Sequence, residues 1–322
     1  MSASTLSPTA YLLVFHGSRD PRPAQAAEYL AQFVRLQLES KPVGLTVAKS
    51  ARPKGYVSPS SYFERLPMPL TSSSPIKAND PGDWPYSAYL PLVGTACLEA
   101  GALSLHEQII EFGHRVSAAG VRSIRIVPLF LLKGIHVSED IPAEVQLAQR
   151  ALPTLTLRLC AHLGSHVGLE GLVRTKLQST TADDWLLLAH GSRRIESNGA
   201  IQSLAESLGG TTAYWAVSPS LETQVIQLIQ QGVQRLAILP YFLFTGPTTD
   251  AVTRRTEDLA ERFPSISFHL LPPLGPSPEL AHLVVDLALG WTPLRQNQGA
   301  ISMKRVAFRH QIQRSSMGVL KR

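Results

Sequence analysis

Cysteine is nearly absent from this chain of 322 residues. Only Cys97 and Cys160 occur, and no Cys-x-x-Cys pair is present. The sequence therefore encodes neither a disulfide framework nor a cysteine-ligated zinc or iron–sulfur site, and we expect two buried structural thiols. No apolar run approaches the ~20 residues that span a bilayer, and residues 1–5 lack the features of a signal peptide. These absences predict a cytoplasmic protein that binds no membrane.

Motifs for several common reactions are absent as well. The chain contains no Gly-x-x-x-x-Gly-Lys-Ser/Thr phosphate loop, no Gly-x-Gly-x-x-Gly fingerprint and no Gly-x-Ser-x-Gly nucleophile elbow. ATP hydrolysis, dinucleotide binding and esterase chemistry therefore lack their usual signatures. The candidates that remain for chemistry are histidines and carboxylates.

Acidic residues are missing from 292–322, a segment that holds seven of the Lys and Arg residues. The formal net charge of the chain is +6, so the basicity belongs to this segment and the rest is slightly negative. Basic tails of this kind are more often solvated than specific binding arms. We therefore predict a disordered tail and no nucleic-acid partner.

An internal duplication is the strongest feature that is present. An apolar run leading into His-Gly-Ser-Arg occurs twice, and two further segments repeat in the same order. The matched segments are 12–19 with 186–193, 121–136 with 233–248, and 159–165 with 270–276. This period is longer than that of solenoid repeats, so the chain is predicted to contain two whole domains. His136 aligns with Thr248, which indicates that one copy has lost chemistry that the other keeps.

Each half alternates apolar runs with helical patterns. In the first half we expect strands near 11–15, 92–97, 123–130 and 155–160, and helices near 24–36, 104–119, 138–150 and 167–176; in the second half we expect strands near 185–189, 212–217, 234–242 and 266–271. Strands that are almost continuously apolar are typical of parallel sheets covered on both faces. The pattern predicts an α/β protein made of two tandem flavodoxin-like, doubly wound parallel sheets.

The domain boundaries follow from the repeat. We place the first domain at 1–178 and the second, with a degenerate site, at 179–291. Residues 41–91 are rich in proline and serine and show no periodic pattern. We predict a largely disordered insertion there, although its aromatic residues leave open that part of it folds over the site as a lid.

The candidate site lies at the strand ends of the first half. His16, Glu99 and His136 follow the first, second and third predicted strands, and carboxyl ends of parallel strands share one edge of a sheet. Taken singly, a histidine at a strand end is more often a hydrogen-bonded turn residue than a ligand. A pair of them with a carboxylate nearby suits a divalent first-row metal, and two imidazoles alone would hold such an ion weakly.

The other histidines carry less information. His106, His114 and His166 fall on helical stretches and are expected at the surface, while His162 could line the site. His190 keeps its motif, but its expected partners have become Thr248 and the segment 218–220.

At these residues the chain resembles the CbiX/SirB sirohydrochlorin chelatases of the class II, ATP-independent group. The resemblance rests on the duplication and on three segments, His-Gly-Ser-Arg-Asp-Pro-Arg at 16–22, Gly-Thr-Ala-Cys-Leu-Glu at 94–99 and the run from Pro128 to Pro142. It implies a lyase that inserts Co(II) or Fe(II) into sirohydrochlorin, on the way to cobalamin or sirohaem. It also implies a monomer whose two chelatase-like halves face each other across a cleft, with no cofactor beyond the substrate metal.

The resemblance assigns roles to particular residues. His16 and His136 match the metal-binding histidines of the family, and Glu99 matches its active-site glutamate. Because sirohydrochlorin carries many carboxylates, cationic and polar residues nearby are expected to orient it. The candidates for substrate binding are Ser18, Arg19, Arg22 and Lys133.

Two other functions remain open at this point. One is a chelatase for another tetrapyrrole, and the other is a carrier that binds metal or tetrapyrrole without catalysis. The intact set of ligands in the first half argues against a carrier, because the second half has already lost its set. Unlike some long members of the family, this chain has no histidine-rich or cysteine-rich extension.

Overall fold

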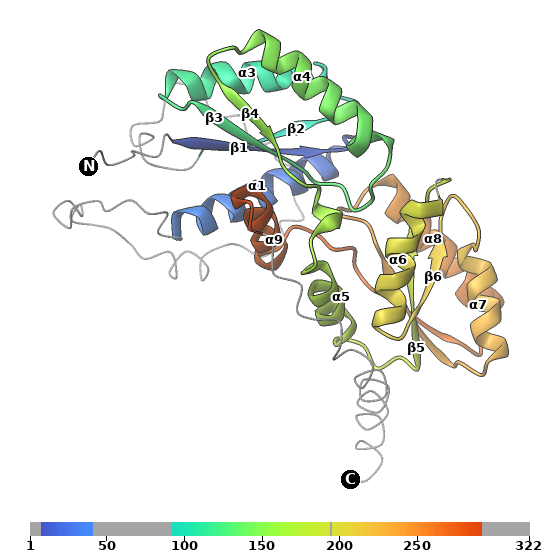
Figure 1. Ribbon diagram of the computed structural model, residues 1–322. Coiled ribbons are helices and arrows are strands. Elements are labelled where there is room, and N and C mark those ends of the chain that lie inside the picture. The colour runs from blue at the N-terminus through green and yellow to red at the C-terminus, as the bar shows by residue number, and fades with distance from the viewer. Residues whose placement is uncertain (1–7, 41–91, 194, 292–322) are drawn as a thin grey trace.

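The computed structural model describes residues 8–40, 92–193 and 195–291 of the chain. The predicted insertion at 41–91 and the predicted tail at 292–322 lie outside these described residues. The described residues form two four-stranded parallel sheets with helices on both faces (Figure 1), which confirms the predicted α/β class. No helix within the described ranges combines the length and the apolar character needed to cross a membrane.

The first half holds one sheet. Its strands are β1 (Thr9–Phe15), β2 (Val93–Cys97), β3 (Ser123–Pro128) and β4 (Thr156–Leu159), and its helices are α1 (Arg22–Ser40), α3 (Leu105–Ala118), α4 (Ile141–Ala151) and α5 (Leu169–Leu177). A π-helical turn (His136–Asp140) precedes α4, and a 3₁₀ turn (Leu163–Ser165) precedes α5. The strands pair in the order β2-β1-β3-β4.

The second half repeats this arrangement. Its strands are β5 (Asp184–Ala189), β6 (Thr211–Tyr214), β7 (Arg235–Pro240) and β8 (Ser267–Leu270), and its helices are α6 (Ile195–Ser207), α7 (Leu221–Gln230), α8 (Pro247–Arg262) and α9 (Pro278–Leu289). The strands pair in the order β6-β5-β7-β8, which is the order of the first sheet. Two copies of one topology are what the sequence duplication predicted.

Alternate residues of the central strands supply the two faces of each sheet. In β1, Leu12 and Val14 join the core formed with α3 and α4. Tyr11 and Leu13 point to the opposite face and join the core formed with α1. Successive side chains on a strand point to opposite faces, so a strand covered on both sides must be apolar at nearly every position.

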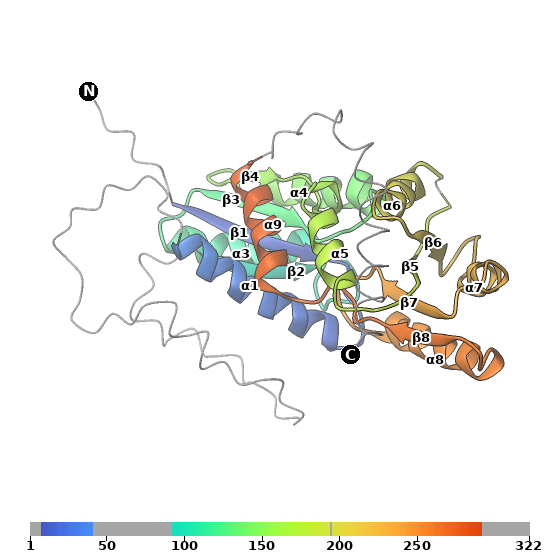
Figure 2. The same ribbon diagram turned by 90° about the horizontal axis from the view of Figure 1, so that it is seen from below.

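The two halves share one hydrophobic core. The helix α9 belongs to the second half by sequence, yet it packs beside α1 on the first sheet (Figures 1 and 2). The helix α5, which ends the first half, lies between α9 and the second sheet. Buried residues of both sheets therefore belong to one continuous cluster that runs from Leu13 and Leu30 through Val173 to Leu187 and Leu280.

Two hydrogen bonds fix α9 against the first half. At its start, Gln37 Nε2 of α1 donates to the carbonyl of Pro278 at 2.6 Å. At its end, Arg125 Nη1 of β3 donates to the carbonyl of Ala288. Carbonyl groups in the last turn of a helix lack partners within the helix, so the arginine satisfies one of them and complements the helix dipole. The first sheet thus depends on a helix that is encoded more than 150 residues later.

His166 is buried, which corrects the expectation that it lies at the surface. Its residue exposure is 7%, and its Nε2 lies 3.7 Å from Asp286 Oδ2 on α9. Its Nδ1 accepts a hydrogen bond from the backbone N–H of Gly168 at 3.0 Å. The sequence pattern failed here because the helix that covers His166 comes from the other half of the chain.

The two cysteines are partly exposed, which corrects the expectation that both are buried. Cys97 ends β2, where its backbone N–H donates to Gln108 Oε1 at 2.9 Å. Cys160 follows β4, and burial raises the pKa of its thiol. A raised pKa keeps the Cys160 thiol protonated and therefore unreactive.

Truncating Leu280 should destabilise the first half as well as the second. Leu280 is fully buried in the shared core, so Leu280→Ala is expected to lower the free energy of unfolding by about 2–5 kcal/mol. Urea denaturation followed by circular dichroism measures this loss, and amide exchange should show weaker protection in β1 and β3. Leu147→Ala removes the same atoms from an exposed position of α4 and serves as the control. Loss of protection confined to the second half would contradict the shared core.

The stability of the fold should fall as the pH drops below about 6.5, the ordinary pKa of histidine. Burial lowers the pKa of His166, and the charge of Asp286 opposes this only in part. The unfolded chain then binds more protons than the folded chain below that pH, so unfolding becomes more favourable as the solution is acidified. His166→Gln should flatten the dependence of the unfolding free energy on pH between 7 and about 5.5. An equal effect of His114→Gln, at an exposed position, would argue against this origin.

Candidate metal site

The first candidate ligand, His16, is held by a glycine that no other residue can replace. His16 follows β1, and Gly17 adopts a φ of 92°, in the left-handed region. A Cβ at Gly17 would lie 1.9 Å from the carbonyl oxygen of Glu99. The backbone N–H of Glu99 donates to the carbonyl of His16 at 2.8 Å. The close approach of these two strand ends therefore requires glycine in the His-Gly-Ser motif.

The candidate carboxylate, Glu99, lies on a turn that α3 holds in place. Gln108 Nε2 donates to the carbonyls of Cys97 and Leu103 at 2.8 and 2.9 Å, on either side of Glu99. Ala100, directly after Glu99, has a φ of 59°, which is unfavourable for a residue with a Cβ. No sequence pattern points to Gln108, because its position on α3 gives no sign that its side chain reaches back to the preceding turn.

The second candidate histidine ligand, His136, opens the π-helical turn before α4. Its Nδ1 lies 2.7 Å from Asp140 Oδ2, one turn further along. A carboxylate on one ring nitrogen fixes the orientation of the imidazole and makes the other nitrogen a better ligand. Asp140 thus directs Nε2 of His136 toward Glu99, a role that no sequence motif indicates.

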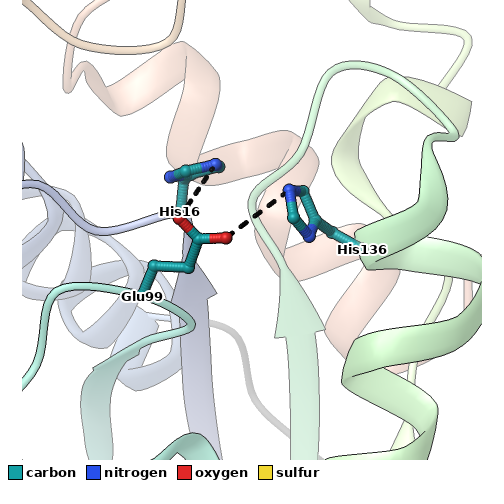
Figure 3. Close-up of side chains that lie close together, drawn as sticks. All are labelled: His16, Glu99 and His136. Atoms are coloured by element: carbon teal, nitrogen blue, oxygen red, sulfur yellow. Dashed lines mark ion pairs between the residues drawn. The ribbon is translucent and has the colours of Figure 1, made fainter.

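The three side chains converge on one point (Figure 3). Glu99 Oε2 lies 3.9 Å from His16 Nε2, and Glu99 Oε1 lies 3.9 Å from His136 Nε2. Each residue has one possible ligand atom within 4.8 Å of those of the other two. In the described part of the chain, this is the group of histidine, cysteine or acidic side chains close enough to share a metal ion. Two donors that each bind an ion at about 2.1 Å lie at most about 4.2 Å apart. Small side-chain rotations would therefore close this set around one divalent ion.

The environment of these ligands is open on one side and apolar on another. The side chains of His16 and Glu99 are more than half exposed, at 55% and 54%. The ring of Phe130 lies 6.2 Å from the ring of His16 and 6.1 Å from that of His136. Two imidazoles and one carboxylate suit cobalt, iron or zinc, and three protein ligands leave further coordination positions free for another molecule.

The predicted substrate-binding residues Ser18, Arg19 and Lys133 lie on the loops that also carry His16 and His136. Ser18 Oγ accepts a hydrogen bond from the backbone N–H of Asp20 at 3.1 Å. Arg19 and Lys133 are exposed. Burial lowers the pKa of His162, and the positive charge of Lys133 lowers it further. Lys133 therefore lies close enough to His162 for the two to interact electrostatically.

Arg22 differs from the other predicted substrate-binding residues because carboxylates already surround it. Its Nε and Nη2 donate to Asp20, and its Nη1 and Nη2 donate to Asp250 at 3.0 and 2.6 Å. Asp250 belongs to α8 in the second half. These bonds hold the Arg22 guanidinium between the two halves of the chain.

Among the described residues of the second half, the matching positions hold no equivalent set of candidate ligands. The backbone N–H of Ala216 donates to the carbonyl of His190 at 2.9 Å, as Glu99 does to His16. Ala216 therefore occupies the position of Glu99, which corrects the alignment of that position with 218–220. Thr248 lies in the first turn of α8, as the sequence alignment with His136 placed it. His190 is left without a carboxylate or a second imidazole at the matching positions.

Solved structures share this fold. A structure described as SirB from Bacillus subtilis with Fe3+ superposes with a TM-score of 0.60 and 17% identity, covering 88% of this chain and 96% of that one. The sirohydrochlorin chelatase SirB from Bacillus subtilis subspecies spizizenii in complex with cobalt gives a TM-score of 0.55 and 16% identity, covering 88% and 95%. At this identity the likeness establishes the fold.

Curated relatives match part of the chain. A chloroplastic sirohydrochlorin ferrochelatase from Arabidopsis thaliana is 34% identical over 127 residues, which cover 36% of this chain and 55% of that protein. A sirohydrochlorin cobaltochelatase from Priestia megaterium is 26% identical over 191 residues, which cover 53% of this chain and 61% of that protein. The chain thus matches less than two thirds of the length of each.

The sequence model of the CbiX family matches both halves, at 87–180 and at 184–288. The first match contains Glu99 and His136 and begins after His16, so His16 joins the site on geometry alone. Together the two matches cover more than half of the chain and repeat in the two sheets. The chain therefore belongs to the CbiX family.

Proposed function

We propose that this chain is a sirohydrochlorin chelatase that inserts Co(II) or Fe(II) into the tetrapyrrole without ATP, in cobalamin or sirohaem biosynthesis. The observation that carries the proposal is the convergence of His16, Glu99 and His136 at the carboxyl ends of three neighbouring strands. The names of the curated relatives support the substrate and both metals. The donor set supports a borderline divalent ion that must be both bound and released.

His16 and His136 would bind the incoming metal. His16 Nδ1 lies 3.1 Å from the carbonyl of Gly17, and His136 Nδ1 is engaged by Asp140. Both rings therefore have Nε2 available on the side where Glu99 lies. An exposed set of three ligands leaves positions on the metal open to the tetrapyrrole nitrogens, so that ligands can exchange one at a time.

Glu99 would take up a proton. Insertion of a divalent ion replaces two pyrrole N–H protons, which must leave as the metal–nitrogen bonds form. The Glu99 carboxylate can accept one of them, and a histidine freed from the metal or water can accept the other. A site that bends the tetrapyrrole exposes its nitrogen lone pairs and disfavours the planar product, which is catalysis by differential binding.

The acidic side chains of sirohydrochlorin would meet the cationic side chains that flank the ligands. Arg19 and Lys133 are exposed on the loops that follow β1 and β3, which also carry His16 and His136. A charged hydrogen bond to a carboxylate is about twice as strong as a neutral one, so such residues orient an acidic substrate. Ser18, on the same loop as Arg19, could add a neutral hydrogen bond. One chain suffices for this arrangement, because both halves are fused through a shared core.

Anaerobic initial rates of metal insertion into sirohydrochlorin test the proposal. The absorbance change is followed with Co(II) and with Fe(II), and the uncatalysed rate is subtracted. We expect multiple turnovers with at least one metal. Stoichiometric binding without turnover would indicate a carrier, and turnover only with a less carboxylated ring would indicate a different tetrapyrrole substrate.

The same assay separates the two halves. His136→Ala should lower the insertion rate by about a hundredfold or more, the range expected when a group that acts directly on the reaction is lost. Thr248→Ala, at the matching position of the second half, should leave the rate within about twofold of the wild type. Equal losses in both variants would contradict a single site in the first half.

Removing the carboxylate behind His136 should weaken metal binding without removing a ligand. Asp140→Asn is expected to raise the dissociation constant for Co(II) by about 10-fold to 100-fold, because the imidazole loses the partner that orients it. Titration followed by the visible absorption of bound Co(II) measures this directly. Glu139→Gln changes an exposed carboxylate next to it and serves as the control. Unchanged affinity in Asp140→Asn would show that the orientation of His136 comes from elsewhere.

A further inference from the structure

A three-residue ion cluster connects the second half to the loop that carries His16. Asp20 lies on this loop, Arg22 begins α1, and Asp250 lies in the first turn of α8. Asp20 and Asp250 each bind the Arg22 guanidinium through both carboxylate oxygens. A Cβ placed on Gly246 would lie 3.4 Å from Pro23 Cγ, so the start of α8 also lies close to the start of α1.

The loop itself is organised around Asp20. The backbone N–H of Arg22 donates to Asp20 Oδ1 at 2.9 Å, while the N–H of Asp20 donates to Ser18 Oγ. His16 and Gly17 precede Ser18 directly, and Gly17 fits against the carbonyl of Glu99 without room for a side chain. A shift of Asp20 would therefore be passed to the segment that positions His16.

Arg22 has little capacity left for a substrate. A guanidinium has five N–H donors, and Arg22 uses its Nε and Nη2 groups on Asp20 and its Nη1 and Nη2 groups on Asp250. The same contacts lower the pKa of Asp20 and of Asp250, so both carboxylates stay ionised at neutral pH. A substrate carboxylate would have to displace one of them from bidentate contact.

The residues of this cluster are not repeated at the matching positions of the two halves. By the repeat, the position that matches Arg22 is Glu196, and the position that matches Asp250 is Ser138. A contact of the same kind in the opposite direction, from residue 196 of the second half to residue 138 of the first, therefore lacks both the arginine and the aspartate. The second half, which lacks the candidate ligands, supplies the carboxylate of Asp250 to the first half, which has them. The first half has Ser138 at the matching position and supplies no such carboxylate in return.

We propose that Asp250 is a positioning residue for metal binding and insertion, which acts through Arg22 and Asp20 to hold the His16 loop in register with Glu99 and His136. The degenerate half then contributes to the chemistry of the intact half without contacting the metal. This assigns Arg22 to the loop support and leaves Arg19 and Lys133 as the cations for the substrate. The part that concerns insertion rests on the proposed chelatase function, whereas the part that concerns metal affinity does not.

Stability and activity should separate in this cluster. The side chains of Arg22 and Asp250 are 42% and 40% exposed, and exposed ion pairs contribute little to folding. The shared apolar core already holds the two halves together. Neutralising Asp250 should therefore leave the melting temperature nearly unchanged while it loosens the His16 loop.

The test compares Asp250→Asn, Arg22→Gln and the double variant in the full-length protein. The control is Asp258→Asn, which removes the same charge from an exposed site on α8 where the partner, Arg255, lies on the same helix. Co(II) affinity is measured first without tetrapyrrole, and then kcat and KM for sirohydrochlorin. We expect both single variants to weaken Co(II) binding and to lower kcat by about tenfold, as for loss of a group that orients a ligand. KM should stay within about twofold, and the double variant should be no worse than either single one.

Three results would overturn the inference. One is an increase in KM for Arg22→Gln alone, which would make Arg22 a substrate ligand. Another is an Asp250→Asn variant that matches Asp258→Asn in Co(II) affinity. The third is a double variant whose loss of Co(II) affinity equals the sum of the two single losses, since the effects of substituting residues that act through one another should not be additive. If the wild type inserts no metal at all, the proposed function fails, and the Co(II) affinities still decide whether Asp250 positions the His16 loop.

Discussion

The structure depends on one constraint, which is that both faces of each parallel sheet must be covered with apolar side chains. For the first sheet, α1 covers only part of one face, and α9 from the far end of the chain covers the rest. The same cluster continues through α5 into the second sheet. Because buried apolar area is the main favourable term in folding, neither half can be removed without exposing the core of the other. The second half is therefore retained for folding whatever happens to its own strand ends.

That dependence explains how one chain can carry the candidate ligand set in one half and lack it in the other. The fold requires the strands, the glycine turns and the covering helices of both halves, and both His-Gly-Ser turns have a glycine with positive φ. It does not require ligands at the ends of the strands. Ala216 and Thr248 stand where the first half has Glu99 and His136, and the hydrogen bond from Ala216 to the carbonyl of His190 matches the one from Glu99 to the carbonyl of His16. The side chains at the carboxyl edge of each sheet can therefore change while the fold is kept.

Membership of the CbiX family gives the cluster of His16, Glu99 and His136 a chemical context. An open cluster of two imidazoles and one carboxylate would bind a divalent ion without enclosing it, as the proposed transfer of the ion requires. The residues that position the candidate ligands lie on different elements. Gly17 directly follows His16, Gln108 lies on α3, and Asp140 lies on the turn that carries His136. The contact of Asp250 with Arg22 extends this support to the second half.

The sequence by itself determined the α/β class, the duplication, the strand positions and the convergence of His16, Glu99 and His136. Periodic burial and strand-end position are local properties, and parallel topology brings those ends together. Only the tertiary structure decided that α9 covers the first sheet, that His166 is buried beneath it, and that Arg22 is bound by Asp250. These features join residues more than 100 positions apart, and no local pattern encodes which helix a given face will meet. The same limit explains Gln108 and Asp140, whose roles depend on where a side chain turns rather than on where it lies in the sequence.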